Sequence, residues 1–460
     1  MVAQQNHPGF LVYLLLFDKV TSGVGHTRMI GVWSVLVATL VAVDVSAADD
    51  TQRIRYDGYT VHQAVSSSHD QFQKFISEAS HIPLNFWHVP HADNDTLDVM
   101  VGPEALNDLQ AVFDKLKMES KQVVDNVESL FEKERRSMHH IKRRATPSIH
   151  SYTVNYHSYS EIIDYLQAVS SSRAKSQNVH ADVFSIGKTT QGKDQAMIKI
   201  YRNDGRAKPA ILIDGGIHAR EWIAPAVVIN FIYQLAFSSD HHISTMLGDF
   251  DWYLMPLVNP DGYEYSRLRD RSWRKTMNVN AHSSCKGTDA NRNFGYHWDP
   301  YSGGSTNPCE EVFAGDHNFS IPESTNLGNF MRQHGPSIKA YLTFHSYGQY
   351  FLYPYGYSSS AVAPDYAELA SLARAMVQPM SSSYVIGSSG KDLYPAAGGS
   401  DDYAKGACGI KYSYTVELPP RDSVGGYTGF ILSPSQIPIV AADTLTGLKA
   451  FAIELARRLH

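Results

Sequence analysis

Short apolar runs alternate with longer segments of helical spacing from residue 152 to the end of the chain. The runs are short enough for buried strands, and the longer segments place their apolar residues on one face, as amphipathic helices do. This alternation is typical of an α/β domain with a largely buried mixed sheet, in which ligands bind at loops beyond the strand ends. Strands are expected at 182–186, 196–201, 210–213, 252–258, 340–344 and 412–416, and helices at 159–170, 224–236, 366–377 and 433–458.

A smaller unit with its own pattern precedes this domain, over residues 53–131. Two or three strands with two helices suffice for a compact α+β module, and Pro103 suits the start of the second helix. Strands are expected at 54–65, 84–89 and 98–101, and helices at 70–79 and 104–116.

The segment between the two units is polar and becomes increasingly basic. Residues 128–144 end in Ile-Lys-Arg-Arg, so that Arg144 directly precedes Ala145. A charge run is usually a solvated helix face. Between two domains of a secreted protein it is also an exposed target for a trypsin-like protease, and we expect cleavage after Arg144.

The first 48 residues have the pattern of a targeting segment. Residues 30–43 form a short apolar run, and Val-Ser-Ala at 45–47 offers the small residues that signal peptidase prefers. The run is shorter than the roughly 20 residues that a spanning helix needs, although a spanning helix is the alternative. We therefore expect a signal-peptide region at 1–48, no membrane anchor and a secreted, extracellular protein. Met29 directly precedes the run and is a candidate for the true start.

Composition narrows the classes of partner. The chain has 460 residues, 43% of them hydrophobic and 19% charged, which suits a globular protein of two or more domains. Its net charge of -6 argues against nucleic acid or an anionic membrane as a main partner. Three cysteines are too few for a disulfide scaffold.

A first pair of candidate metal ligands lies in Gly-Gly-Ile-His-Ala-Arg-Glu-Trp, just after the buried run at 210–213. His218 and Glu221 are three residues apart, so both can face one side of a turn or helix start. A catalytic zinc usually takes three ligands of the His and Asp or Glu type. The pair alone is weak evidence, because the same spacing occurs on solvated helix starts. His345, which directly follows the apolar run at 340–344, is the candidate for the third ligand.

Further polar residues stand in contexts that suit a substrate pocket. An arginine fork can bind a carboxylate through two parallel hydrogen bonds, and a neighbouring amide can fix its orientation. Each residue taken alone also fits a solvated charge or a turn. The candidates are Arg271, Arg274, Asp289, Asn291, Arg292, Tyr394 and Asp401, together with Glu417 at the end of the apolar run 412–416.

In their order along the chain, these motifs resemble the zinc metallocarboxypeptidases of the pancreatic carboxypeptidase A/B type, and most closely the carboxypeptidase B-like zymogens. The matching segments are His-Ala-Arg-Glu, Asn-Pro-Asp-Gly-Tyr, Asp-Ala-Asn-Arg-Asn, Thr-Phe-His-Ser-Tyr and Gly-Ile-Lys-Tyr-Ser-Tyr-Thr-Val-Glu. The resemblance implies a small α+β, ferredoxin-like propeptide domain at 49–126 and a connecting helix with the activation site at 127–144. It implies an α/β catalytic domain at 145–460, whose mixed, mostly parallel sheet of eight strands is flanked by helices.

The resemblance also implies roles for single residues. His218, Glu221 and His345 would hold one zinc ion per chain, and Asp289 would accept a hydrogen bond from the far ring nitrogen of His218. Glu417 would be the general base and Arg274 would stabilise the oxyanion. Asn291, Arg292 and Tyr394 would bind the terminal carboxylate of the substrate, while Arg271 and Arg220 would line the substrate path. Cys285 and Cys309 match the disulfide positions of the family, which leaves Cys408 as a small unpaired core residue.

The expected function is that of a monomeric zymogen, activated by a trypsin-like protease and acting on peptide or protein C-termini. Asp401 stands where carboxypeptidase B-like enzymes have an acidic residue, and a buried carboxylate there would favour C-terminal Lys or Arg. The alternatives are an Asp401 that turns to solvent, a carboxypeptidase A-like preference for apolar residues, and a secreted binding protein without turnover. In the propeptide, Asp93 or Asp95 is a candidate ion-pair partner for a cleft arginine.

Overall fold

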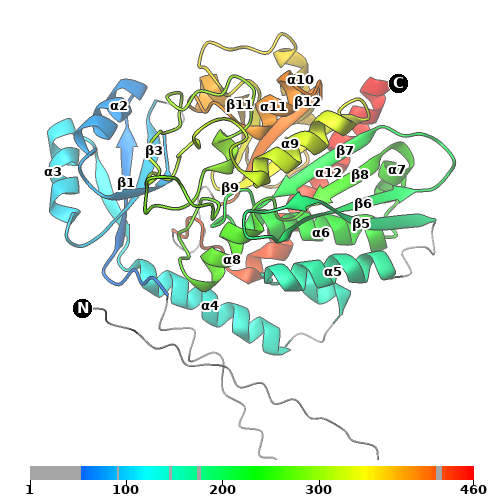
Figure 1. The fold of residues 1–460 in the computed structure, drawn as a ribbon, viewed down its shortest axis with the longest axis horizontal. Coiled ribbons are helices and arrows are strands. Elements are labelled where there is room, and N and C mark those ends of the chain that lie inside the picture. The colour runs from blue at the N-terminus through cyan, green and yellow to red at the C-terminus, as the bar shows by residue number, and fades with distance from the viewer. Residues whose placement is uncertain (1–52, 91–92, 145–147, 173–177, 421–426) are drawn as a thin grey trace, which may run out of the picture. The chain divides into compact units, whose positions relative to one another are not determined.

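The computed structural model describes residues 53–90, 93–144, 148–172, 178–420 and 427–460 (Figure 1). The expected signal-peptide region lies outside the described residues, and so do residues 145–147 next to the expected cleavage site.

The first described unit is a four-stranded antiparallel sheet in the order β2-β3-β1-β4 (Figure 1). Helices α2 and α3 pack their apolar sides on one face of it, where the rings of Phe75 and Phe113 stack with centroids 5.4 Å apart. Helix α2 begins after Ser68, whose side chain accepts a hydrogen bond from the Gln71 amide. The elements are β1 (Thr60–Ser66), α2 (His69–Glu78), β2 (Leu84–His88), β3 (Asp95–Val101), α3 (Leu106–Leu116) and β4 (Ser120–Val124).

The opposite face of this small sheet packs against the larger part of the protein. Side chains alternate along β3, so Leu97 lies under the helices while Met100 points to the second face. There Met100 joins a buried apolar cluster that includes Phe131 of α4 (Val127–Arg144), Tyr347 and Phe430. The first unit therefore covers the region just beyond His345.

The larger part is built on an eight-stranded mixed sheet in the order β11-β10-β12-β9-β7-β8-β6-β5. Four of its neighbouring pairs are parallel and three are antiparallel, and the parallel run β12-β9-β7-β8 forms its centre. The strands are β5 (Val179–Lys188), β6 (Asp194–Arg202), β7 (Ala210–Gly215), β8 (Asp251–Met255), β9 (Ile338–Ser346), β10 (Tyr350–Tyr353), β11 (Val385–Ser388) and β12 (Tyr412–Leu418).

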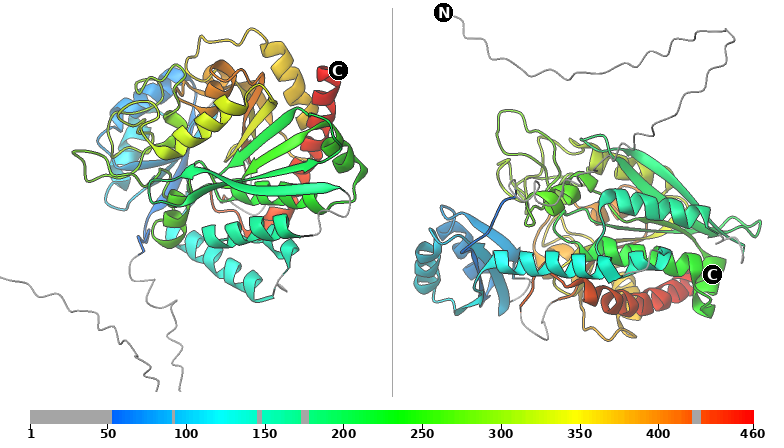
Figure 2. Two further views of the ribbon diagram at one scale, coloured as in Figure 1. Left: turned by 45° about the vertical axis from the view of Figure 1, so that its right-hand side comes forward. Right: turned by 90° about the horizontal axis from the view of Figure 1, so that it is seen from below.

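Helices cover both faces of this sheet (Figure 2). All six residues of β7 are buried, as expected for an apolar strand between two helical layers. One apolar cluster holds the helices α5 (Tyr159–Ser171), α6 (Ile223–Phe237), α7 (His241–Asp249), α10 (Tyr366–Val377) and α12 (Ile437–Leu459), with Tyr263 of α8 (Pro260–Leu268). The cluster on the other face holds α9 (Pro322–His334) and α11 (Ser400–Gly406).

In the part of the chain that the structure describes, no single helix is long and apolar enough to cross a membrane. The pair α6 and α7 meets the length and composition criteria together, but the two helices are bent by 92° at the break between them.

The α/β class, the mixed sheet and the preceding α+β unit agree with the expectation, and α10 occupies 366–377 as predicted. The strand expected at 54–65 begins only at Thr60, because Gly58 turns the chain with a φ of 76°. The strand expected at 252–258 ends at Met255, since Pro256 has no amide hydrogen for the ladder. The helix expected at 433–458 starts at Ile437, after a short 3₁₀ turn at Pro434–Gln436. Strands β4, β10 and β11 were not predicted.

Candidate metal centre and substrate cleft

A tight turn between β7 and α6 positions the first two candidate ligands. Gly216 has a φ of 65°, and a Cβ atom at this residue would lie 2.8 Å from the Leu257 side chain, so the turn needs glycine here. The amide of Ala219 donates to the carbonyl of Arg274 at 2.9 Å. As a result His218 Nδ1 lies 2.8 Å from Glu221 Oε1.

His345, near the end of β9, completes this group. Its Nδ1 atom lies 3.1 Å from His218 Nδ1 and 3.1 Å from Glu221 Oε2. All three side chains are buried, and one donor atom from each lies within 4.8 Å of the others. Two imidazole nitrogens and a carboxylate oxygen are a donor set that fits zinc and leaves room for a further ligand.

Asp289 lies behind His218 and fixes its tautomer. Its Oδ1 atom is 3.2 Å from His218 Nε2, so the ring carries its proton on Nε2 and leaves Nδ1 free to bind a metal. Its Oδ2 atom accepts from Arg274 Nη2 at 2.9 Å. Burial alone would raise the pKa of Asp289, but the Arg274 guanidinium and the His218 ring hold that pKa well below its usual range. Asp289 therefore remains a carboxylate.

Glu417 of β12 is the register partner of His345 on the neighbouring parallel strand. Both side chains thus leave the same face of the sheet. The Oε2 atom of Glu417 is buried and has no hydrogen-bond partner among the described residues. Burial raises the pKa of Glu417, while the nearby His345 ring opposes the shift. An unpartnered carboxylate oxygen beside the candidate ligands is well placed to accept a proton.

Arg292 is held in a fixed orientation close to these groups. Its Nε donates to the carbonyl of Gly303 at 2.8 Å, and its Nη1 donates to the carbonyl of Asn291 at 3.0 Å. Asn291 Oδ1 accepts from the Ser400 amide at 2.9 Å, which ties this segment to the start of α11.

Burial lowers the pKa of Arg274, but Asp289, Glu221 and the half-buried Tyr394 raise it above its usual value. Tyr394 therefore lies near Arg274.

Asp401 lies in the first turn of α11 and does not turn to solvent, since only 5% of it is exposed. Its carboxylate accepts one side-chain hydrogen bond, from Ser389 Oγ at 3.3 Å. A Cβ atom on Gly399 would come within 2.8 Å of Asp401 Oδ1, so a larger residue at this position would clash with the carboxylate. Burial raises the pKa of Asp401.

Asp402, the neighbouring acid, has a different environment. Its carboxylate accepts from the amide of Gly356 at 2.8 Å and from the amide of Tyr357 at 2.9 Å. Asp402 therefore anchors the loop that contains Gly356 and Tyr357. Asp401 retains oxygen lone pairs that can accept hydrogen bonds from a ligand.

Two arginines expected along the substrate path are in contact with the first unit or with α4, the helix that follows it. Arg271 forms a buried ion pair with Glu134 of α4, with Nε to Oε2 at 2.6 Å and Nη2 to Oε1 at 3.1 Å. Arg220 donates to Asn85 Oδ1 at 2.9 Å and to the carbonyl of Phe86 at 3.0 Å. The first unit and α4 therefore occupy hydrogen-bonding groups that these arginines would offer a substrate.

The prediction that Asp93 or Asp95 forms an ion pair with a cleft arginine was wrong. Among the described residues, the cleft arginines pair with other carboxylates and not with these two. Asp95 instead faces β10, where its Oδ2 accepts from the hydroxyl of Tyr350 at 3.1 Å. Glu134 and Asn85 were missed by the sequence analysis. Glu134 is one charge within a polar run, and only the packing of α4 distinguishes it from its exposed neighbours.

The expected Cys285–Cys309 disulfide is present, with the two Cα atoms 5.0 Å apart. Cys408 is unpaired and half-buried at the edge of an apolar cluster, and burial raises the pKa of its thiol to about 11. Helix α4 ends at Arg144, whose side chain is not among the side chains that the structure describes.

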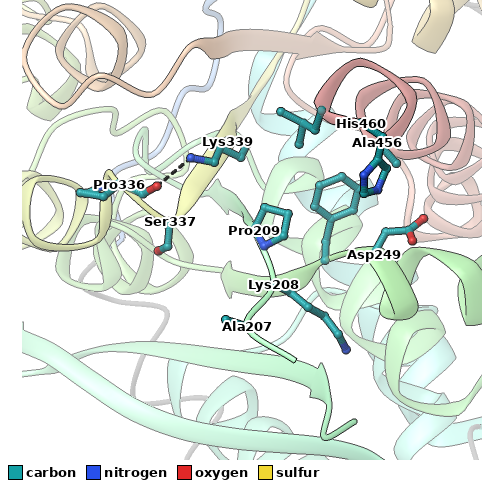
Figure 3. A pocket seen from close by; sticks show the side chains of 11 residues that line it. Ala207, Lys208, Pro209, Asp249, Pro336, Ser337, Lys339, Ala456 and His460 are labelled. Atoms are coloured by element: carbon teal, nitrogen blue, oxygen red, sulfur yellow. Dashed lines mark hydrogen bonds between the residues drawn. The ribbon is translucent and has the colours of Figure 1, made fainter. Parts of the chain in front are cut away.

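A cavity of about 380 Å³ lies at the opposite end of the central strands, next to the residues that precede β7 and β9 (Figure 3). The Lys339 ammonium on its wall donates to the carbonyl of Pro336 at 2.7 Å, and Lys208 donates to the carbonyls of Arg202 and Leu247. The candidate metal ligands lie away from this cavity, at the carboxyl ends of the parallel strands, where ligands usually bind in α/β sheets.

Comparison with known families agrees with this geometry. The model of the zinc carboxypeptidase family matches residues 162–447. The chain belongs to the zinc carboxypeptidase family. A carboxypeptidase activation peptide matches residues 62–134, so this metallocarboxypeptidase is a zymogen and its first unit is an activation peptide. The family implies zinc, and the group formed by His218, Glu221 and His345 fits that metal.

Relatives of this zinc carboxypeptidase carry the names of both specificity types. Carboxypeptidase B of Astacus astacus is 40% identical over 303 residues, which is 65% of this chain and 96% of the relative. Zinc carboxypeptidase A 1 of Anopheles gambiae is 32% identical over 432 residues, which is 93% of this chain and 96% of the relative. The crystal structure of the carboxypeptidase A from Helicoverpa armigera aligns with a TM-score of 0.80 at 28% identity, covering 87% of this chain and 98% of that one. Similarity alone therefore does not decide the side-chain preference.

Proposed function

We propose that this protein is a secreted zymogen that, after cleavage behind Arg144, removes C-terminal Lys or Arg from peptides. One zinc ion would be held by His218, Glu221 and His345. The observation that carries the proposal is the position of Glu417, whose unpartnered, buried carboxylate oxygen faces the same space as the three candidate ligands. The apolar run at 30–43 and the Cys285–Cys309 disulfide support secretion, because disulfides persist in oxidising compartments.

Each residue of the cleft has a defined task in peptide hydrolysis. Zinc, when bound, lowers the pKa of a water molecule to about 7 and polarises a carbonyl oxygen. Glu417 takes the proton of the attacking water and returns it to the leaving amine. Arg274 keeps Nε and Nη2 on Asp289, so its Nη1 on the Glu221 side is the donor for the developing oxyanion.

The arginine clamp accounts for the cleavage of terminal residues only. Arg292 is oriented by two backbone carbonyls and Asn291 by the Ser400 amide, so both can receive a carboxylate without rearranging. An internal peptide segment has no carboxylate to offer them. Tyr394, which lies near Arg274, is placed to close over the bound chain end.

Asp401 supports the preference for basic residues. It is buried, carries a single side-chain hydrogen bond and has a raised pKa, so its negative charge is poorly compensated in the free enzyme. A lysine or arginine side chain would compensate that charge, whereas an apolar side chain would leave it buried and unpaired.

The decisive experiment compares two matched peptides that end in Arg and in Phe. The purified precursor is treated with trypsin, and release of each terminal residue is measured with and without a zinc chelator. We expect chelator-sensitive release of Arg well above that of Phe. Preferred release of Phe would favour the carboxypeptidase A-like alternative. Absence of chelator-sensitive release from either peptide would favour a binding protein without turnover.

Glu134→Gln is expected to weaken the hold of the activation peptide on the cleft. Removing one partner of a buried ion pair costs about 3–5 kcal/mol, because the other charge stays buried. The uncleaved variant should therefore show peptidase activity that the parent lacks, and trypsin should activate it faster. Both are measured as release of C-terminal Arg over time.

Glu132→Gln is the matched control, since Glu132 lies on the same helix but its side chain is 38% exposed and pairs with Arg136. Exposed pairs are worth about 0–1 kcal/mol, so this precursor should behave like the parent. Equal behaviour of the two variants would show that the Arg271–Glu134 pair does not secure the zymogen.

A further inference from the structure

A row of polar side chains crosses the central strands one step below the candidate ligands. Asp214 of β7 is the register partner of Thr343 of β9, and Thr343 is the partner of Thr415 of β12. Residues two apart on a strand share a face, so Thr343 and His345 point to the same side of the sheet. Burying such polar groups costs free energy unless they are hydrogen-bonded. The presence of this row in the centre of the sheet therefore suggests that it has a function.

Asp214 is the group in this row whose burial is most costly. It is fully buried, and no ion pair to it is present among the described residues. Its Oδ2 atom accepts a hydrogen bond from the Tyr341 hydroxyl at 2.7 Å. Its Oδ1 atom has no hydrogen-bond partner in the part of the chain that the structure describes. Burial raises the pKa of Asp214 to about 6, and the hydroxyls of Tyr341 and Thr343 oppose the shift.

Thr343 stands between this carboxylate and His345. Its Oγ1 atom lies 3.2 Å from His345 Nε2. Because His345 Nδ1 faces His218 and Glu221, the ring proton belongs on Nε2, and Nε2 donates it to Thr343 Oγ1. A hydroxyl that accepts one hydrogen bond still has its own proton to donate, and the unpartnered Oδ1 atom of Asp214, the register partner of Thr343, is an open acceptor on the neighbouring strand.

We propose that Asp214 is a positioning residue for the reaction, which fixes the tautomer and ring orientation of His345 through the Thr343 hydroxyl. Asp289 makes the equivalent contact with His218 directly, at 3.2 Å. The two histidines thus have separate carboxylate supports on different segments. This assignment rests on the proposed role of His345 as a zinc ligand.

The second oxygen of Asp214 extends the support toward the side-chain pocket. The Tyr341 hydroxyl, which is 2.7 Å from Asp214 Oδ2, also lies 3.0 Å from Ser400 Oγ. Ser400 begins α11, the helix that carries Asp401. One buried carboxylate therefore connects the candidate metal ligand with the floor of the pocket.

Thr343→Val tests the assignment, because valine keeps the shape of threonine and removes its hydroxyl. Zinc affinity is measured on the full-length precursor by competition with a chelator, independently of activity, and thermal unfolding is followed in parallel. We expect about 10- to 100-fold weaker zinc binding, the usual effect of removing the partner of a metal-binding histidine. Thr343→Ser, which keeps the hydroxyl, should restore the affinity of the parent.

Tyr341→Phe is the matched control, since it removes a hydroxyl from the same carboxylate without touching His345. It should lower the melting temperature but leave zinc affinity unchanged. Parent affinity in Thr343→Val, or an equal loss in Tyr341→Phe, would overturn the proposal. If Thr343→Val does not fold, Asp214→Asn takes its place and should weaken zinc binding relative to Tyr341→Phe. A parent precursor that binds no zinc would instead refute the proposed function.

Discussion

Glu417→Gln is expected to lower kcat of the activated enzyme by about 10²- to 10⁴-fold, the usual contribution of a general base. Glutamine has nearly the same size and keeps the contacts of the strand, but it cannot take the proton of the attacking water. The Oε2 atom of Glu417 has no hydrogen-bond partner among the described residues, so the replacement breaks no hydrogen bond at that atom. The measurement is the release of C-terminal Arg at saturating peptide, together with the zinc content of the same sample.

Two comparisons separate loss of the base from loss of the metal. Glu417→Gln should contain as much zinc as the parent, because Glu417 is not among the three candidate ligands. Glu417→Asp keeps a carboxylate at a shorter reach and should retain an intermediate rate. A Glu417→Gln enzyme with the kcat of the parent would remove Glu417 as the base, and a matching loss of zinc would assign it to the metal site.

The parts of the site at strand ends could be predicted from the sequence, because the pattern itself marks those positions. His218, His345 and Glu417 each follow a buried apolar run, and the carboxyl ends of parallel strands meet at one edge of a sheet. The structure places His345 and Glu417 as direct register partners on β9 and β12. Their roles, by contrast, came from the resemblance and not from periodicity.

The contacts between distant segments could not be predicted. Glu134 and Arg271 are 137 residues apart, and nothing in the polar run of α4 distinguishes Glu134 from Glu132. Asp214 lies within an apolar strand, where its partners depend on the register of β7 with β9. The strands β10 and β11 have four residues each, too few for an alternation of apolar and polar residues to be recognised.

Replacing Asp401 should change the preferred substrate more than the rate of the chemistry. Asp401→Asn keeps the shape of the side chain and removes its charge, so an Arg or Lys side chain in the pocket would lose its ion-pair partner. Breaking a buried ion pair costs about 3–5 kcal/mol, which corresponds to a loss of about 10²- to 10⁴-fold in kcat/KM for the basic substrate. Asp401→Ile should show the same loss and also a gain for peptides that end in Phe, because an apolar side chain no longer faces a buried carboxylate.

The pair of variants distinguishes charge from shape, and two further variants test the hydrogen bond of Asp401 and the neighbouring acid. Ser389→Ala removes the one side-chain hydrogen bond of Asp401 and should have a much smaller effect on the preference. The ratio of kcat/KM for Arg and Phe peptides is measured for each activated enzyme. Asp402 is satisfied by the amides of Gly356 and Tyr357, so Asp402→Asn should lower stability without inverting this ratio. An unchanged ratio in Asp401→Ile would mean that another residue sets the pocket, and an inversion in Asp402→Asn would identify that residue.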